Sequence, residues 1–149
     1  MNRRLFVLAS LSLPLLPQVA FATPSRMTVY RSPTCGCCGA WIEHVRAAGY
    51  DVTTIEVDQD ELWSQKVAGG VPEDLASCHT AFIDGYTIEG HVPAEDIARL
   101  VSERPEGRGL AVPGMPAGSP GMEMGARVDA YDVMLFGDDA ETIVYSSHG

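Results

Sequence analysis

Three of the four cysteines in this 149-residue chain lie within the four residues Cys35-Gly36-Cys37-Cys38, and Cys78 is far away in the sequence. This clustering limits what disulfides can contribute to the fold. In a chain-entropy model, a Cys35–Cys38 bridge stabilises a fold by about 2 kcal/mol and a bridge to Cys78 by about 4 kcal/mol. Two structural disulfides are the ordinary use of four cysteines in an exported protein, and that reading stays open. The clustering favours a reactive or metal-binding role for the cysteines over a structural one. Without long-range disulfides, the fold depends on a hydrophobic core.

Alternating strand and helix patterns supply that core. A strand is predicted at 27–30, directly before the cysteines, and an amphipathic helix is predicted at 39–48, where Gly49 ends it. The elements that follow are a strand at 51–57, a helix at 58–67, a short helical start at 71–73, a hairpin of strands 80–83 and 86–88 around Asp84-Gly85, and a helix at 93–104. This order predicts an α/β sandwich with a mixed sheet.

The C-terminal part has a different composition. Residues 107–125 are rich in glycine, proline and methionine, which predicts a loop that reaches over another part of the molecule. Residues 131–136 and 142–145 flank Gly137-Asp138-Asp139 and predict an added C-terminal β-hairpin at a sheet edge.

The first 22 residues have the pattern of a secretory signal peptide, with Arg3-Arg4, an apolar stretch and small residues before the expected cleavage site. The apolar stretch is shorter than the roughly 20 residues that a membrane-spanning helix needs, so no stable anchor is expected after cleavage. Residues 23–149 then form a single domain in the periplasm. Removal of residues 1–22 takes the net charge from −10 to −12, which disfavours nucleic acid and anionic membranes as partners.

The cysteine cluster has the position of a reactive or metal-binding site. A Cys-x-x-Cys sequence between a strand and a helix places Cys35 beside unpaired N–H groups and the positive end of the helix dipole, which lowers a thiol pKa. Cys37 adds a third sulfur that a simple dithiol exchanger does not need. Cys78-His79 precedes the strand at 80–83, and in a thioredoxin-like topology Cys78 lies near Cys35. The alternatives are a small inert disulfide, a buried Cys78 and, for His79, an ordinary loop residue.

Met115, Met122 and Met124 lie in the flexible loop rather than at helical spacing, which favours a ligand role over core packing. Thiolate, thioether and imidazole together select Cu(I), whereas Ca²⁺ and Mg²⁺ need oxygen ligands. Packing of the loop by these methionines is the alternative. The remaining histidines (His44, His91 and His148) are interpreted as ordinary surface or structural residues, and we find no hydrolase or phosphoryl-transfer motif.

Four segments carry a family resemblance: Ser32-Pro33-Thr34-Cys35-Gly36-Cys37-Cys38-Gly39-Ala40-Trp41, Ser77-Cys78-His79-Thr80-Ala81, Gly90-His91-Val92-Pro93 and Gly109-Leu110-Ala111-Val112-Pro113-Gly114-Met115-Pro116. Their combination resembles the CopG-type copper-resistance proteins, a family long labelled as of unknown function. The resemblance extends over most of residues 27–148. It implies a thioredoxin-like fold, a periplasmic location and copper held by the Cys-x-Cys-Cys cluster and Cys78, with a multinuclear, sulfur-bridged cluster as one arrangement.

The resulting hypothesis is a periplasmic Cu(I)-binding protein in copper resistance or homeostasis, with a redox role. Its metal ligands are predicted to be Cys35, Cys37, Cys38, Cys78, His79, Met115, Met122 and Met124, and its partners are copper ions and periplasmic copper transporters or reductants. In the oxidising periplasm, a metal-free form with a Cys35–Cys38 disulfide is also expected. The main alternative is a thioredoxin-type thiol-disulfide oxidoreductase that uses Cys35 and Cys38, and a third is a structural domain with two disulfides.

Overall fold

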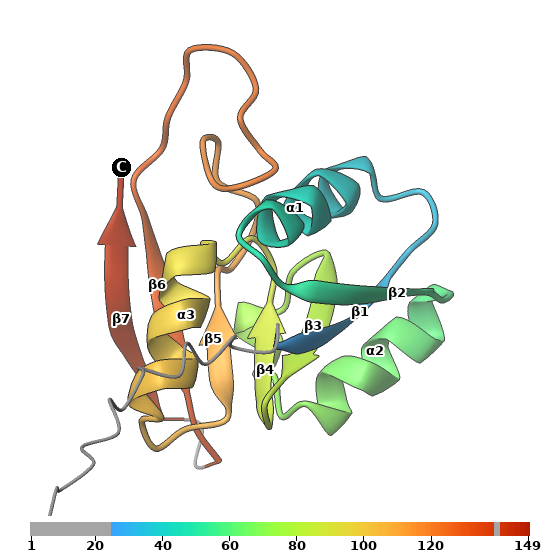
Figure 1. The fold of residues 1–149 in the computed structure, drawn as a ribbon, viewed down its shortest axis with the longest axis vertical. Helices are drawn as coiled ribbons and strands as arrows, with labels where there is room; N and C mark the ends of the chain where they lie inside the picture. Colours follow the sequence, from blue (N-terminus) through green and yellow to red (C-terminus); the bar gives the residue numbers. More distant parts are fainter. Residues whose placement is uncertain (1–24, 139–140) are drawn as a thin grey trace, which may run out of the picture.

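One mixed β-sheet forms the centre of the molecule (Figure 1). The structure is a computed structural model that describes residues 25–138 and 141–149, so the predicted signal peptide lies outside the described residues. In these ranges the elements are β1 (Arg26–Arg31), α1 (Gly36–Ala47), β2 (Asp51–Glu56), α2 (Gln59–Ala68), the 3₁₀ turn η1 (Glu73–Leu75), β3 (His79–Ile83), β4 (Tyr86–Glu89), α3 (Ala94–Glu103), β5 (Gly109–Ala111), β6 (Tyr131–Phe136) and β7 (Thr142–His148). None of the described helices has the length and apolarity needed to cross a bilayer.

The strands follow the order β2-β1-β3-β4-β5-β6-β7 across the sheet. The pairs β1/β2 and β4/β5 are parallel, and the other neighbouring pairs are antiparallel. The prediction of an α/β fold with a mixed sheet and an added C-terminal hairpin is therefore confirmed. The assignment to the thioredoxin-like type within that class stays a prediction.

The prediction of an uninterrupted loop at 107–125 is wrong for Gly109–Ala111, which form β5 between β4 and β6. This strand is short and completely buried, so it has no polar alternation that a sequence pattern could show. Its glycine has a steric reason, because a Cβ atom at Gly109 would overlap the Thr87 carbonyl of β4. The surrounding glycines and prolines predict a loop, and the strands that pair with β5 are distant in the sequence, so the sequence pattern did not indicate this strand.

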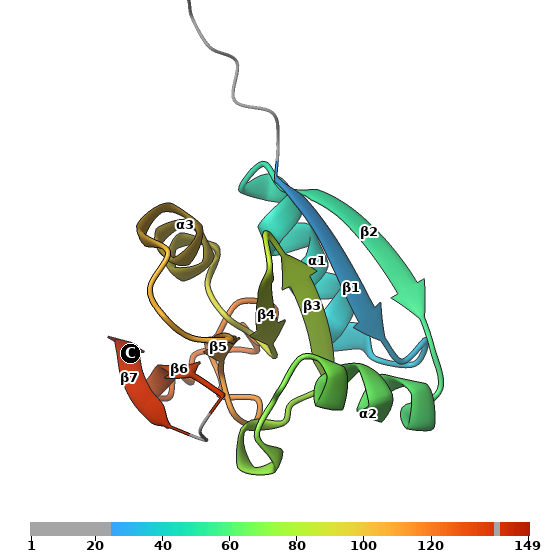
Figure 2. The same ribbon diagram turned by 90° about the horizontal axis from the view of Figure 1, so that it is seen from below.

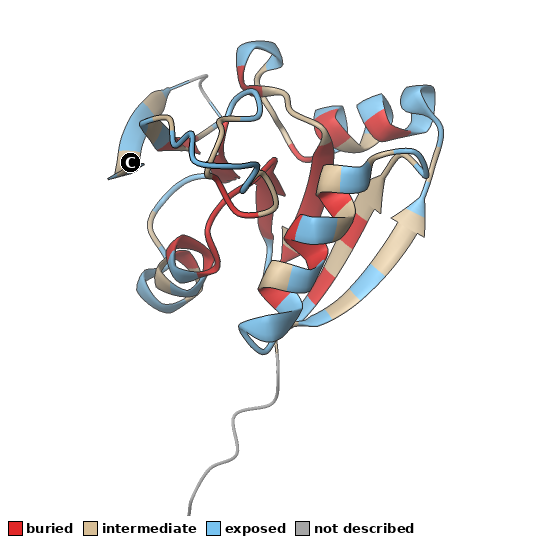
Figure 3. Cartoon of the chain, turned by 90° about the horizontal axis from the view of Figure 1, so that it is seen from above, coloured by how far each residue is buried: buried red, intermediate tan, exposed pale blue. Residues whose placement is uncertain are grey.

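The sheet separates two layers of helix. α1 and α3 pack on one face, where Trp41 and Val45 of α1 and Leu100 of α3 share one apolar cluster with the strands. α2 lies on the opposite face (Figure 2). Colouring by burial shows the central strands as the most buried part of the sheet (Figure 3). Fully burying an aliphatic side chain such as Leu100 contributes about 1.5–3 kcal/mol, so this core holds the fold without long-range disulfides.

Candidate metal centre

The cysteine cluster begins where β1 ends. Cys35 is the N-cap residue of α1, with an extended backbone (φ −82°, ψ 97°), and its N–H donates to the Ser32 carbonyl at 3.1 Å. The Arg31 guanidinium donates to the Cys35 carbonyl at 2.9 Å and pairs with Glu56 at 2.6 Å. These bonds place Cys35, Cys37 and Cys38 on the first turn of the helix.

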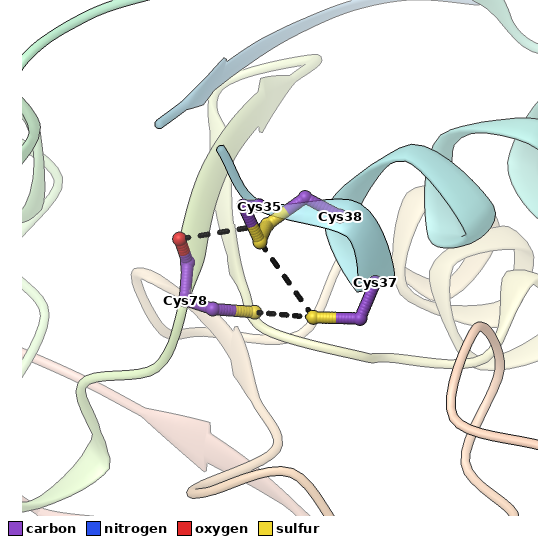
Figure 4. Close-up of side chains that lie close together, drawn as sticks. All are labelled: Cys35, Cys37, Cys38 and Cys78. Atoms are coloured by element: carbon purple, nitrogen blue, oxygen red, sulfur yellow. Dashed lines mark hydrogen bonds between the residues drawn. A yellow bond between two sulfur atoms is a disulfide. The ribbon is translucent and has the colours of Figure 1, made fainter. Parts of the chain in front are cut away.

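Cys35 and Cys38 are joined in the disulfide that the sequence predicts, with their Cα atoms 5.4 Å apart (Figure 4). Cys38 is completely buried, whereas Cys35 is half-buried. Cys37 and Cys78 are free thiols, so the protein does not have the two bridges of the purely structural reading.

The sheet register brings the distant cysteine to this cluster. β1 and β3 are antiparallel with Arg31 opposite His79, so the residue before β3 lies beside the residues after β1. That residue is Cys78, and its thiol sulfur lies 4.0 Å from that of Cys37 (Figure 4). Cys37 in turn lies 3.6 Å from the Cys35 sulfur. The sulfurs of the four cysteines lie within 4.8 Å of one another, as the sequence predicted for Cys78 and Cys35.

Two imidazoles complete the surroundings of Cys78. The Cys78 sulfur lies 3.4 Å from Nδ1 of His79 and 3.1 Å from Nε2 of His91. These three residues form a second group of potential ligand atoms within 4.8 Å. Sequence reasoning assigned His91 to ordinary structure and so missed it. The signal was available in the hairpin: Thr80 of β3 pairs with Glu89 of β4, so residues just after β4 lie beside residues just before β3.

The contacts of His91 define which of its nitrogens faces the site. Nδ1 lies 2.7 Å from the Pro120 carbonyl oxygen, which can only accept a hydrogen bond, so Nδ1 carries the proton. Nε2 therefore presents a lone pair toward the Cys78 thiol. Burial lowers the pKa of His91, which keeps this imidazole neutral and suited to bind a metal.

His79 is completely buried, and its ring lies 4.3 Å from the Trp41 ring, measured between centroids. Its Nε2 atom has no hydrogen-bond partner among the described residues. Burial, and after it electrostatic interactions with the neighbouring His91 and Lys66 side chains, hold the pKa of His79 well below 6.5. This imidazole is therefore also neutral at physiological pH.

The Cys78 thiol is held in its protonated form. Burial raises its pKa to about 12, and the adjacent Cys37 thiol adds to the effect. A protonated Cys78 between neutral imidazoles keeps a partly buried site free of uncompensated negative charge. A metal ion that binds this sulfur must displace the proton.

The three predicted methionine ligands have different positions. The Met115 sulfur lies 3.9 Å from the Cys37 sulfur, and the side chain is 54 % exposed, so it forms part of the outer wall of the site. Met124 is 73 % exposed and Met122 is half-buried. Within the described residues, the structure shows no sulfur contact between either of them and the cysteines. A ligand role for Met122 and Met124 stays a prediction.

The loop that carries Met115 is held against the first turn of α1. Gly121 has a positive φ of 85°, and a Cβ atom there would lie 2.7 Å from the Trp41 amide nitrogen and 3.0 Å from the Cys37 carbonyl. Glycine thus lets the loop pass directly over the cysteines. The other histidines are engaged elsewhere: His44 accepts the Ala94 N–H at 3.1 Å, and His148 contacts Asp96 at 2.7 Å.

The fold and the site together define an α/β protein with a preassembled group of sulfur and imidazole ligands, the donor set that soft metal ions select. The family model described as "Protein of unknown function, DUF411" matches residues 75–122. No curated protein matches the chain.

Two solved structures resemble it over most of its length. Copper resistance protein CopG, form 2, has a TM-score of 0.79 and 46 % sequence identity, and the match covers 85 % of this chain and 100 % of that one. Form 1 has a TM-score of 0.78 and 45 % identity over 85 % of this chain and 98 % of that one. The chain therefore belongs to the CopG family of copper resistance proteins, which confirms the resemblance seen in the sequence.

Proposed function

We propose that the protein is a periplasmic Cu(I)-binding protein of copper resistance, in which Cys35, Cys37, Cys38 and Cys78 hold the metal. The observation that carries this proposal is the convergence of four sulfurs, three from the start of α1 and one from the start of β3, within 4.8 Å. The names of the related structures support copper as the metal.

The remaining donors support the same choice. The Met115 thioether beside Cys37 suits Cu(I), because thioethers and thiolates are soft ligands that select this ion. His79 and His91 add neutral imidazole nitrogens on the other side of Cys78. Because four cysteine sulfurs lie within 4.8 Å of one another, a multinuclear, sulfur-bridged cluster is the arrangement we favour. Met122 and Met124 would then be further ligands, supplied by a loop that closes over the site.

Cys35 and Cys38 can bind the metal as thiolates only after their disulfide is reduced. A dithiol reductant that is itself oxidised to a disulfide supplies two electrons and two protons, which gives two thiols at Cys35 and Cys38. Metal binding then releases protons from the thiols to solvent. We propose that metal binding is coupled in this way to the redox state of the cysteines, and that periplasmic reductants and copper transporters are the partners.

The test is an anaerobic titration of the reduced protein with Cu(I) in competition with a chelator of known affinity. Tight binding is expected in the wild type, and Cys35→Ser, Cys78→Ser and Met115→Leu should each lower the stoichiometry or the affinity. Met134→Leu on β6 is the matched control for Met115→Leu, because it removes a thioether outside the site and should leave Cu(I) binding unchanged. Failure of the reduced wild type to bind Cu(I) tightly would refute the proposal.

A thiol-disulfide oxidoreductase is the second candidate, and one observation favours it. The half-buried Cys35 at the helix N-terminus is paired with the fully buried Cys38, as expected for an attacking and a resolving thiol. Catalysed reduction of insulin, or a mixed disulfide trapped in Cys38→Ser, would support this activity.

A further inference from the structure

A buried carboxylate lies directly beneath the segment that carries Cys78. Glu89, at the end of β4, is completely buried, and its Oε1 atom accepts the Ser77 backbone N–H at 2.6 Å. Its Oε2 atom accepts the Thr80 hydroxyl at 2.7 Å. Glu89 therefore fixes the chain on both sides of Cys78-His79 with one side chain.

The charge of Glu89 is balanced by a lysine of α2. The Lys66 ammonium of α2 lies 2.6 Å from Glu89 Oε1 and 3.1 Å from the Thr80 hydroxyl. The side chains of Lys66 and Glu89 are only 7 % and 0 % exposed. A buried ion pair of this kind contributes little net stability compared with apolar side chains of the same volume, because both charges lose their hydration. What apolar side chains could not replace is the pair of hydrogen bonds to Ser77 and Thr80.

The same contacts reach the loop above the site. The Ser77 hydroxyl donates to the Gly114 carbonyl at 2.7 Å, and Gly114 immediately precedes Met115. Ser77 also packs closely against Gly90, the residue after β4. A Cβ atom at position 90 would lie 2.6 Å from the Ser77 hydroxyl oxygen, so this position requires a glycine. A continuous chain of hydrogen bonds thus runs from Lys66 through Glu89 and Ser77 to the residue before Met115.

We propose that Glu89, supported by Lys66, is a positioning residue of the metal centre that holds Cys78 and, through Ser77, the Met115 loop at their places beside the Cys-x-Cys-Cys cluster. This inference rests on the proposed Cu(I)-binding function. Glu89 does not bind the metal, and its effect is to set the position of two elements that are far apart in the sequence. Groups that orient metal ligands through hydrogen bonds typically change metal affinity about 10- to 100-fold when they are removed.

Two double variants separate positioning from charge. Lys66→Met/Glu89→Gln and Lys66→Met/Glu89→Met both lack the ion pair and have nearly the same volume. The glutamine amide oxygen still accepts the Ser77 N–H and its NH₂ group can bond to Thr80, whereas methionine can do neither. The measurements are Cu(I) affinity by anaerobic chelator competition and the number of sulfur ligands by copper-edge X-ray absorption.

Cu(I) affinity is expected to fall about 10- to 100-fold in the methionine variant, with fewer sulfur ligands per copper, and to stay close to the wild-type value in the glutamine variant. Equal affinities of the two variants beside a tightly binding wild type would overturn this inference alone. A wild type that binds no Cu(I) would refute the proposed function and this inference with it.

If Lys66→Met/Glu89→Met does not fold, a double-mutant cycle of Ser77→Ala and Met115→Leu tests the positioning role instead. Ser77→Ala removes only the bond to Gly114, so Met115→Leu should cause a smaller loss of Cu(I) affinity in the Ser77→Ala background than in the wild type. Strictly additive losses would contradict a positioning role for this chain of hydrogen bonds.

Discussion

Acid should destabilise the protein through His79, which is buried in the sheet beside Trp41. Burial, and then electrostatic interactions with His91 and Lys66, hold its pKa well below 6.5 in the folded protein, whereas a histidine in the unfolded chain titrates near 6.5. Below pH 6.5 the unfolded state therefore binds a proton that the native state does not, and the free energy of unfolding falls. The contribution to stability is present above pH 6.5 and is lost as the pH falls.

The magnitude follows from the linkage between proton binding and folding. One pH unit below 6.5, a histidine that stays neutral in the folded state lowers the free energy of unfolding by about 1.4 kcal/mol. His79→Phe removes this titration and places an apolar ring in an apolar environment next to Trp41. His91 is also buried, but it is present in both proteins and its effect cancels in the comparison.

The assay is guanidinium-induced unfolding of the oxidised protein at pH 7.5 and pH 5.5, followed by circular dichroism. Between these conditions the wild type should lose about 1.4 kcal/mol more stability than His79→Phe. Between pH 8.5 and pH 7.5, where the histidine is neutral in both states, the two proteins should change alike. Equal losses on acidification would show that folded His79 takes up a proton, which would refute this reasoning.

Three further perturbations test the packing around the site. Gly121→Ala should lower the free energy of unfolding by about 1–3 kcal/mol, because its φ of 85° and the contact with the Trp41 amide leave no room for a methyl group; an unchanged denaturation midpoint would contradict this packing. Trp41→Phe loses both ring volume and the 2.8 Å hydrogen bond to the Val92 carbonyl, and it should cost about 1–3 kcal/mol in chemical denaturation; a cost near zero would contradict the contact. Reduction of the Cys35–Cys38 disulfide should lower stability by only about 2 kcal/mol, so the reduced protein should remain folded by circular dichroism; unfolding on reduction would show that the apolar core is insufficient.

Local patterns in the sequence were sufficient for most of the secondary structure. The helix after the cysteines was predicted from the spacing of Trp41, Val45 and Ala48, and the structure has α1 at Gly36–Ala47. The hairpin was predicted from Asp84-Gly85, and both residues have positive φ, at 48° and 87°. These features depend on neighbours close in the chain, so residue order alone determines them.

The candidate site was predictable to the extent that its residues lie next to element boundaries. A cysteine before β3 and cysteines after β1 follow from the sequence, and an α/β topology places them together. His91 was missed because its role depends on the Pro120 carbonyl and the Cys78 thiol, which lie 29 and 13 residues away. The available signal was the hairpin pairing, which places residues just after β4 beside residues just before β3.

The sequence by itself determined the cysteine spacing and most of the helices and hairpins, because the helices and hairpins are set by periodicity and turn chemistry over a few residues. Only the tertiary structure decided that Gly109–Ala111 form a central strand and that a buried Glu89 supports the Cys78 segment. Strand pairing and burial depend on what a segment meets after the chain has folded. Short segments that pair with distant partners therefore carry no local signal of their role.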